Sequence, residues 1–463
     1  MKRTESLKRL IISEFPLIGL IAQAGVYGYY WMTAYYPFLH LHRNLRYYFK
    51  GHVLMLLVYL VMLYFFTSTY GGLKIGYLKP VDVYFSQFFS LLGVNVISYL
   101  QISLMANWLV DAGPIVKTML IQLILAAVWV YVGNMLYRKA FPPREILLVH
   151  GERSIDDIVA KFDSRKDKYR INRCINISGG METIREEILS GYGAVVLWDI
   201  PVEKRNELLK FCYSRSIRVY LMPKISDVLI QGSDQLHLFD APIMLIREYA
   251  LKAEQRIIKR LIDLICSVIL LVIASPFMLI TAAAIKLYDR GPVLYKQIRC
   301  TQDAREFYIL KFRSMRVDAE KDGIARLAAR NDDRITPVGR FIRAVRIDEL
   351  PQLFNILKGD MSFIGPRPER PEIIAQYVEE MPEFVFRMKV KAGLAGYAQV
   401  YGKYNTTPYD KLKLDLTYIE NYSVWLDLKL MLLTLKILFK PESTEGVDSG
   451  QTTARKQETE KKL

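Results

Sequence analysis

The sequence predicts a membrane protein of mixed architecture: an N-terminal transmembrane helix bundle, a Rossmann-like α/β domain, and a C-terminal module of mixed α/β elements with its own membrane helix. Three observations predict this fold class. Of the 463 residues, 52% are hydrophobic although 24% are charged, a mixture that indicates membrane spans joined to sizeable soluble parts. Long apolar stretches fill the first part of the chain, and short apolar runs alternate with polar, helix-like segments after it.

Residues 1–140 are expected to form a bundle of about four transmembrane helices. The N-terminus is basic and no small-residue cleavage site follows it, which favours a retained anchor. The basic residues between Lys2 and Arg9, and the Arg138-Lys139 pair, predict that both ends of the bundle face the cytoplasm. The basic loop at residues 43–50 disagrees, so the topology of the first hairpin stays open. The apolar, aromatic-rich stretches are residues 15–38, 52–70, 83–105 and 114–135.

Residues 145–250 show the alternation of strands and helices that is typical of parallel βαβ units, which predicts a small Rossmann-like domain. The turn after its first strand, His150 to Ser154, lacks the G-x-G-x-x-G fingerprint. A structural or regulatory role is therefore favoured over tight dinucleotide binding. The expected strands are residues 146–149, 194–198 and 219–222, and the expected helices are 155–162, 181–189 and 203–214.

A further apolar segment begins the C-terminal module, which we place at residues 256–440 with its membrane helix at 257–288. Ser275-Pro276 interrupts this helix, because proline removes a backbone donor and the serine can satisfy the freed backbone group. Length alone fits both a straight span and a bent, re-entrant helix that returns to the same face. The last residues, 441–463, are charged and contain no aromatic side chain, which predicts a disordered tail.

Composition narrows the chemistry of the C-terminal half. No histidine follows His237, so a serine–histidine hydrolase or a histidine-ligated zinc site is excluded there. The 4 cysteines have no paired metal-ligand spacing. The net charge of +16 is typical of proteins that meet nucleic acid, anionic lipid or phosphorylated substrates, or of basic flanks beside membrane spans. Because the basic residues gather around carboxylates and membrane segments, small phosphorylated substrates explain them better than nucleic acid.

The candidate active site is the adjacent pair Asp348 and Glu349. Neighbouring carboxylates on one turn point in different directions, so one could attack phosphorus while the other holds a divalent cation. An acidic pair at a helix start, solvent-facing and favoured by the helix dipole, is the plain alternative. Arginines suited to phosphate oxygens bracket the pair, and strand-like runs upstream alternate apolar and basic residues. The bracketing residues are Arg343, Arg346, Arg367 and Arg370, and the runs are residues 291–299 and 308–315.

From about Arg256 to Lys440 the sequence resembles the catalytic module of the bacterial sugar transferases, the monotopic polyprenyl-phosphate phosphoglycosyl transferases. The arrangement of the whole chain is similar to the large members, of the undecaprenyl-phosphate glucose/galactose phosphotransferase type, that start capsule or exopolysaccharide synthesis. Cys300 and Arg346-Ile347 depart from the family's usual residues. Besides Ser275-Pro276, the matching blocks are GPVLYKQ (291–297), LKFRSM (310–315), DELPQLFNILKGDMSFIGPRP (348–368), GLAGYAQV (393–400) and LDLTYIENYSVWLDLKL (414–430).

The resemblance implies roles for individual residues. Asp348 would be the nucleophile and Glu349 a ligand of Mg²⁺. The positions that match the family's phosphate-binding site are Lys311, Arg343, Arg367 and, at its margin, Arg370. The resemblance also implies a re-entrant helix with Ser275-Pro276 at its bend, and hence an active site that faces the cytoplasm from the bacterial inner membrane.

The implied reaction is transfer of a sugar 1-phosphate from a UDP-sugar to undecaprenyl phosphate, through a covalent phosphosugar on Asp348. Bacterial membrane lipids are further expected partners, nucleic acid is not, and homo-oligomerisation is left open. Two alternatives remain: direct attack by the lipid phosphate with Asp348 as a metal ligand, or a membrane scaffold or regulator that uses the Rossmann-like domain. The sequence does not name the sugar; glucose or galactose is preferred by family analogy.

Overall fold

The computed structural model describes residues 2–43, 45–238, 240–246, 250–317, 332, 334–402 and 406–438, with side chains from residue 14 onward. The chain divides into two compact units, residues 1–223 and 224–463. The predicted tail, 441–463, lies outside the described residues. The division falls well before residue 250, where we placed the end of the α/β domain. The reason is that Val228 of α9 (Ile225–Gln231) is buried in the hydrophobic core of the second unit.

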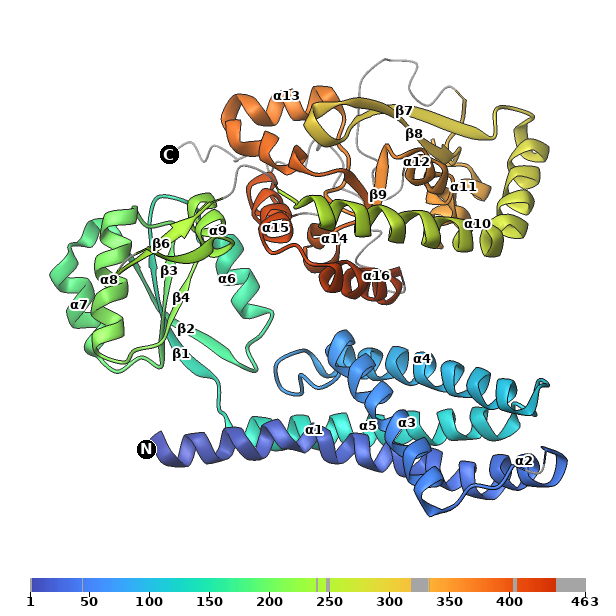
Figure 1. Cartoon of the computed structure of the whole chain (residues 1–463). Helices are drawn as coiled ribbons and strands as arrows, with labels where there is room; N and C mark the ends of the chain where they lie inside the picture. Colours follow the sequence, from blue (N-terminus) through green and yellow to red (C-terminus); the bar gives the residue numbers. More distant parts are fainter. Residues whose placement is uncertain are drawn as a thin grey trace. The chain divides into compact units, whose positions relative to one another are not determined.

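The first unit begins with long helices that pack side by side (Figure 1). Their outward side chains, such as Leu57, Ile124 and Tyr131, are apolar and exposed, as expected for helices that face lipid. Inside, Gln122 donates to the backbone carbonyl of Gln23 and to the Tyr59 hydroxyl, so polar contacts join the helices. The helices are α1 (Lys2–Tyr30), η1 (Trp31–Tyr35), α2 (Tyr36–Arg43), α3 (Phe49–Tyr70), α4 (Pro80–Ala106) and α5 (Gly113–Ala140).

Four helices in the described part of the chain are long and apolar enough to cross a membrane: α3, α4, α5 and α10 (Ala253–Asp289). Three of the four spans predicted in the N-terminal region therefore meet this criterion. The first predicted stretch, 15–38, does not form one regular helix, because a π-helical turn, η1, separates α1 from α2. Glycines, tyrosines and a glutamine in this stretch lower its mean hydropathy.

An α/β layer completes the first unit. Its sheet has the strand order β2-β1-β3-β4, with every neighbouring pair parallel. Residues Ile146 to Val149 of the central strand are buried on both faces, as parallel sheets require. Strand β2 was missed by sequence analysis, because it is an edge strand whose side chains are mostly polar and partly exposed. The elements are β1 (Arg144–His150), α6 (Asp156–Asp163), β2 (Tyr169–Asn176), η2 (Ile177–Gly179), α7 (Met181–Leu189), β3 (Ala194–Trp198), α8 (Val202–Ser214) and β4 (Val219–Leu221).

In the described part of the second unit, helices and three two-stranded sheets enclose a large hydrophobic core, beside a smaller buried cluster around Ile285. The predicted strand-like runs form the antiparallel pair β7–β8, and β9 pairs in parallel with β10. Besides α9 and α10, its elements are β5 (Asp234–Leu238), β6 (Ala241–Leu245), β7 (Leu294–Cys300), η3 (Gln302–Ala304), β8 (Glu306–Phe312), α11 (Pro337–Ala344), η4 (Ile347–Glu349), α12 (Gln352–Lys358), β9 (Met361–Ile364), α13 (Pro371–Glu380), η5 (Pro382–Lys389), β10 (Ala392–Ala395), α14 (Tyr397–Tyr401), α15 (Pro408–Glu420) and α16 (Val424–Leu438).

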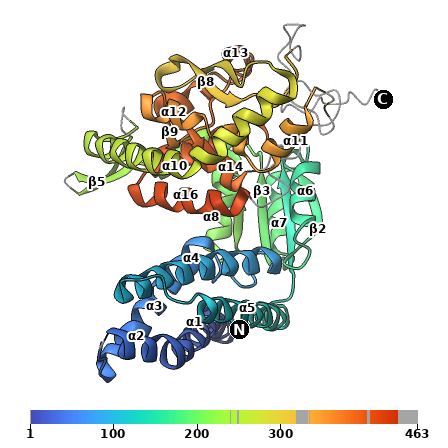
Figure 2. The same ribbon diagram turned by 90° about the vertical axis from the view of Figure 1, so that its right-hand side faces the viewer.

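Helix α10 has an inverted surface: its buried stripe is largely polar and its exposed face is apolar. Lys259, Asp263 and Ser267 are buried, whereas Val272 and Leu279 are 69% and 71% exposed. A helix with such a face is suited to lipid on one side and to a polar module on the other. The ribbon of α10 changes direction part-way along (Figures 1 and 2).

Ser275-Pro276, the predicted break, lies inside α10, which runs as one helix from Ala253 to Asp289. Pro276 has no N–H to donate to the carbonyl of Val272, four residues earlier, and its ring crowds that carbonyl. The Ser275 hydroxyl donates to the same Val272 carbonyl at 2.9 Å and so replaces the missing backbone hydrogen bond. Proline inside a helix is a usual cause of a kink, which accounts for the change of direction.

Buried charges attach the first half of α10 to the module. The Lys259 ammonium donates to Asp427 at 2.7 Å and to the Ile364 carbonyl at 2.9 Å. Arg260 donates to the carbonyls of Ile356 and Leu357 in the last turn of α12, and the Ile356 carbonyl also accepts from the N–H of Gly359. These directional bonds add to the apolar contacts that Cys266 and Leu271 of α10 make with the core of the unit.

We expect Lys259→Met to destabilise the second unit by about 3–5 kcal/mol, because it leaves the Asp427 carboxylate buried without its cation. The measurement is the free energy of unfolding in detergent micelles. Lys358→Met is the control, since Lys358 is 76% exposed and its ion pair to Asp360 should contribute about 0–1 kcal/mol. Equal stability of the two variants would contradict this account of the helix attachment.

Candidate functional site

The acidic pair lies on η4, a short 3-10 turn between α11 and α12. Arg346, the residue before the turn, adopts the left-handed conformation with φ 60°, which is uncommon for a residue other than glycine. This backbone strain sits directly beside Asp348 and Glu349, and such strain is found most often at functional sites. Lys311 and Arg346 act on both carboxylates of the turn, but the hydrogen bonds of the two carboxylates differ.

Asp348 is buried, and one of its carboxylate oxygens accepts no hydrogen bond. Its exposed fraction is 9%, and its Oδ1 atom has no hydrogen-bond partner. Burial, and next the charge of Glu349, raise the pKa of Asp348 to about 6, although Lys311 and Arg343 act in the opposite direction. At neutral pH this carboxylate is ionised yet poorly solvated, which favours its reaction with an electrophile.

Glu349 has the opposite environment. Its Oε1 atom accepts from Lys311 Nζ and from Arg367 Nη2, each at 3.0 Å. Burial alone would raise the pKa of Glu349, but the charges of Lys311 and Arg367 outweigh burial and hold that pKa well below its usual value. Glu349 is therefore a permanent anion whose charge is neutralised by two cations from distant parts of the sequence.

Lys311 reaches this position because β8 is held in place by α12. Asn355 of α12 accepts from the backbone N–H of Leu310 at 3.0 Å and donates to the carbonyl of Tyr308 at 2.8 Å. The side-chain amide thus binds the strand on both sides of Ile309, two residues before Lys311. Sequence analysis missed Asn355, although it lies in the block that carried the family resemblance.

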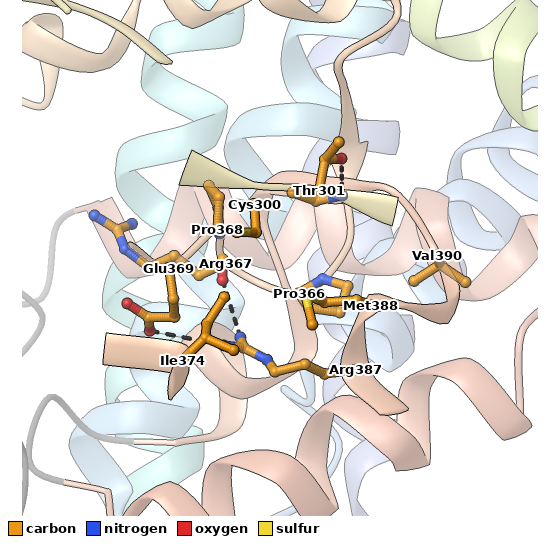
Figure 3. A pocket seen from close by; sticks show the side chains of 11 residues that line it. Cys300, Thr301, Pro366, Arg367, Pro368, Glu369, Ile374, Arg387, Met388 and Val390 are labelled. Carbon is orange, nitrogen blue, oxygen red and sulfur yellow. Dashed lines mark hydrogen bonds and ion pairs between the residues drawn. The ribbon is translucent and has the colours of Figure 1, made fainter. Parts of the chain in front are cut away.

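Of the other predicted phosphate-binding residues, the structure brings some close to the pair. Arg343 on α11 is near enough for its charge to lower the pKa of Asp348, and Arg367 contacts Glu349 directly. Arg370 precedes α13, and its charge acts on Arg299, so it lies with a second cluster behind the Arg367 loop. That cluster also holds Glu369, which lines a small pocket together with Arg367 and Arg387 (Figure 3).

A metal could be held only with help from a substrate. In the described residues, no group of three or more His, Cys, Asp or Glu side chains is placed to bind an ion. Mg²⁺ often takes one or two carboxylates, several waters and the phosphate oxygens of a substrate. The unpartnered Oδ1 of Asp348 and the ionised Glu349 fit that incomplete set of ligands.

The site is joined to the second half of α10. Ile285, near the end of this helix, forms a buried cluster with Phe312 of β8 and Ile342 of α11, and Ile347 of η4 packs against them. The two halves of the membrane helix therefore both contact the module, the first through Lys259 and the second beside the acidic pair.

The fold and the site together define a membrane protein whose C-terminal module gathers two carboxylates and several cations in one partly buried position. Carboxylates and arginines in such a pattern are typical of sites for phosphorylated groups.

The chain belongs to the bacterial sugar transferase family. The family described as "Bacterial sugar transferase" matches residues 254–441. A UDP-glucose:undecaprenyl-phosphate glucose-1-phosphate transferase of Caulobacter vibrioides is 39% identical over 190 residues, which are 40% of this chain and 71% of the relative.

Other relatives are longer than the matching region. A UDP-N-acetylgalactosamine-undecaprenyl-phosphate N-acetylgalactosaminephosphotransferase of Aeromonas hydrophila is 40% identical over 236 residues, covering 50% of this chain and 55% of the relative. An undecaprenyl-phosphate glucose phosphotransferase of Komagataeibacter xylinus is 46% identical over 186 residues, covering 38% and 35%. This chain thus matches about a third to a half of the length of these two proteins.

Replacing each carboxylate by its amide should change the unfolding free energy in opposite directions. The folded-state pKa of Asp348 lies above its unfolded value of 3.8, so its contribution to stability is full below pH 3.8 and is lost as pH rises through about 6. Asp348→Asn should therefore raise the unfolding free energy at pH 8 by up to about 3 kcal/mol, and by much less at pH 4.

Glu349→Gln is the matched variant, and its effect on the unfolding free energy at pH 8 should have the opposite sign to that of Asp348→Asn. The pKa of Glu349 is depressed, so its contribution to stability is present above its unfolded value of 4.5 and is lost as pH falls toward the folded pKa. This variant should be less stable than the parent at pH 8. Unfolding monitored at pH 8 and pH 4 checks both, and a destabilised Asp348→Asn protein at pH 8 would contradict the assigned environment.

Proposed function

We propose that this protein transfers a sugar 1-phosphate from a UDP-sugar to undecaprenyl phosphate, giving undecaprenyl-diphospho-sugar and UMP. The observation that carries the proposal is the contrast within the acidic pair: Asp348 keeps an unpartnered oxygen, while Glu349 is neutralised by two cations. The names of its relatives supply the substrate classes, since they act on UDP-sugars or on undecaprenyl phosphate.

In the proposed first step, an Asp348 oxygen attacks the β-phosphorus of the UDP-sugar. A bond forms between that oxygen and phosphorus, the bond from the β-phosphorus to the bridging oxygen breaks, and UMP leaves. A phosphosugar remains on the carboxylate. Lys311, Arg343 and Arg367 are the cations that would offset the repulsion between a carboxylate and a diphosphate.

In the second step, an oxygen of undecaprenyl phosphate attacks the same phosphorus. The acyl-phosphate bond to Asp348 breaks, the carboxylate is restored, and a diphosphate links lipid and sugar. In a loose phosphoryl-transfer transition state the charge spreads over the equatorial oxygens, so positioned cations give most of the rate enhancement. Mg²⁺, held by Glu349 and substrate oxygens, would add charge neutralisation of the diphosphate.

The membrane helix explains how a lipid substrate could reach this site. We propose that α10 is re-entrant, entering and leaving the bilayer on the cytoplasmic face of the inner membrane. The support is that both of its halves contact one polar module, while its exposed side chains are apolar. A lipid phosphate in the headgroup layer would then lie at the level of the acidic pair, which reduces the entropic cost of the encounter.

We propose that this reaction is the first membrane step of capsule or exopolysaccharide synthesis, because its product would be a lipid-linked diphospho-sugar. The sugar is not settled by the relatives, because their names include glucose, galactose and N-acetylgalactosamine. Since the reacting atoms are the same in all three, discrimination must come from contacts to the sugar ring.

The testing experiment uses the full chain in nanodiscs with undecaprenyl phosphate, Mg²⁺ and one UDP-sugar at a time, and measures UMP. We expect UMP from a single donor class, and a loss of about 10³-fold or more in Asp348→Asn because the nucleophile is gone. Glu379→Gln, an exposed carboxylate on α13, is the control. No UMP from any donor with folded protein would refute the proposal and favour a scaffold or regulator.

A single-turnover measurement separates the covalent route from direct attack by the lipid phosphate. Without undecaprenyl phosphate, the covalent route releases up to one UMP per protein and leaves a phosphosugar on Asp348. Direct transfer in a ternary complex releases none. Mass spectrometry of the peptide that contains Asp348 identifies the adduct.

The pH dependence should report the ionisation of Asp348. Because the carboxylate must be deprotonated to attack, kcat/KM should rise with pH to a plateau above a pKa of about 6. Lys311→Met removes a cation that lowers this pKa, so the residual activity of the variant should rise at higher pH than that of the parent. Lys296→Met, an exposed lysine on β7, is the control and should leave the midpoint unchanged.

A further inference from the structure

The loop that presents Arg367 is tethered along its backbone. Prolines on both sides of Arg367 restrict its conformation, and each carbonyl from residue 366 to 370 accepts a hydrogen bond. Three of these donors are backbone N–H groups and two are arginine side chains. The donors, in order of the carbonyls, are the N–H of Gly393, Arg387 Nη2, Arg299 Nη1, the N–H of Cys300 and the N–H of Ile374.

Arg387 is the donor that holds Arg367 itself. Its Nη2 atom lies 2.9 Å from the Arg367 carbonyl oxygen, and a dashed line marks this contact in Figure 3. Arg387 is also paired with Asp415 of α15, through Nε at 2.9 Å and Nη2 at 2.8 Å. The two side chains are only 3% and 1% exposed, so this pair is part of the core of the module.

Glu369 balances the charges behind the loop. Its carboxylate contacts Lys411 directly and lies 3.6 Å from Arg299 and 3.8 Å from Arg387. Burial would raise the pKa of Glu369, but Lys411 and Arg387 outweigh burial and lower it to about 2. Glu369 is therefore ionised at neutral pH, and it gives Arg387 a second carboxylate partner besides Asp415.

Arg387 and Glu349 thus contact Arg367 at its two ends. The backbone carbonyl is bound to the core by Arg387, and the guanidinium donates to Glu349 at 3.0 Å. We propose that Arg387 is a positioning residue: it sets the place of the Arg367 guanidinium at the acidic pair without touching substrate. This inference rests on the proposed function, because its readout is turnover.

A purely structural role would have different consequences. If Arg387 only stabilises the core, its replacement lowers turnover by the same factor whether or not Arg367 has a guanidinium. If Arg387 positions Arg367, replacing Arg387 should hardly change turnover in a protein that already lacks the Arg367 guanidinium. A double-mutant cycle distinguishes the two, because residues that act through one another are not additive.

The main variant is Arg387→Lys, which keeps a cation for Asp415 but lacks the planar fork that reaches both the carboxylate and the loop carbonyl. A second variant, Arg387→Met with Asp415→Leu, removes both partners so that no charge is left buried and unpaired. Each is made in the parent and in Arg367→Ala. Arg305→Lys is the control arginine, since it pairs with Asp360 and is 59% exposed.

We expect Arg387→Lys to lower kcat/KM for the UDP-sugar by about 10- to 100-fold, since small displacements of a positioned group have effects of that size. In the Arg367→Ala background the same change should cost less than about two-fold. The double replacement Arg387→Met with Asp415→Leu should lower kcat/KM in the parent and have little effect in the Arg367→Ala background, as Arg387→Lys does. Arg305→Lys should leave kcat/KM unchanged in both backgrounds. The unfolding midpoint of each variant is recorded beside its kinetics.

Three outcomes would overturn the inference. Equal losses in both backgrounds would assign Arg387 to core stability, as would failure of both Arg387 variants to fold. Unchanged kcat/KM in a folded Arg387→Lys protein would show that the tether is dispensable. Failure of the proposed function is distinguishable, because the parent protein would then release no UMP from any donor.

Discussion

The rest of the site depends on two hydrogen bonds that share one acceptor. Lys311 and Arg367 both donate to the Oε1 atom of Glu349. It gathers cations from a strand and from a loop beside one carboxylate, and it leaves Asp348 as the neighbour with an unsatisfied oxygen. Two adjacent carboxylates in similar environments would have similar pKa values. Here burial raises the pKa of one, while paired charge depresses the pKa of the other, and such a division suits a nucleophile beside an electrostatic partner.

The surrounding module keeps these cations in place with buried polar bonds. Asn355 binds the strand that carries Lys311, and Arg387 binds the loop that carries Arg367. Helix α10 is attached to the same module by Lys259 at one half and by Ile285 at the other. A lipid-facing helix and a site for anions are thus parts of one core, so the position of one constrains the position of the other.

The predictions from sequence were most accurate where periodicity is strong. The buried strands β1 and β3 are continuous apolar runs, and the pair β7–β8 alternates with the period of a strand, so all four were anticipated. Strand β2 was missed because an edge strand needs no apolar face. The second compact unit begins at residue 224, before the expected end of the α/β domain at residue 250, because Val228 of α9 packs against core residues far along the chain.

Composition and periodicity were sufficient for three of the four predicted N-terminal spans, for α10 and for most of the alternating α/β elements, and the sequence singled out the acidic pair as a candidate site, since each is encoded within a short segment. The side chains that contact the acidic pair could not be predicted from a short segment. Lys311, Glu349 and Arg367 are distant in sequence, and the buried support from Arg387 and Asp415 has no local pattern. Which carboxylate is neutralised and which remains free depends on distances and burial, and these arise only when the strand, the turn and the loop fold against each other.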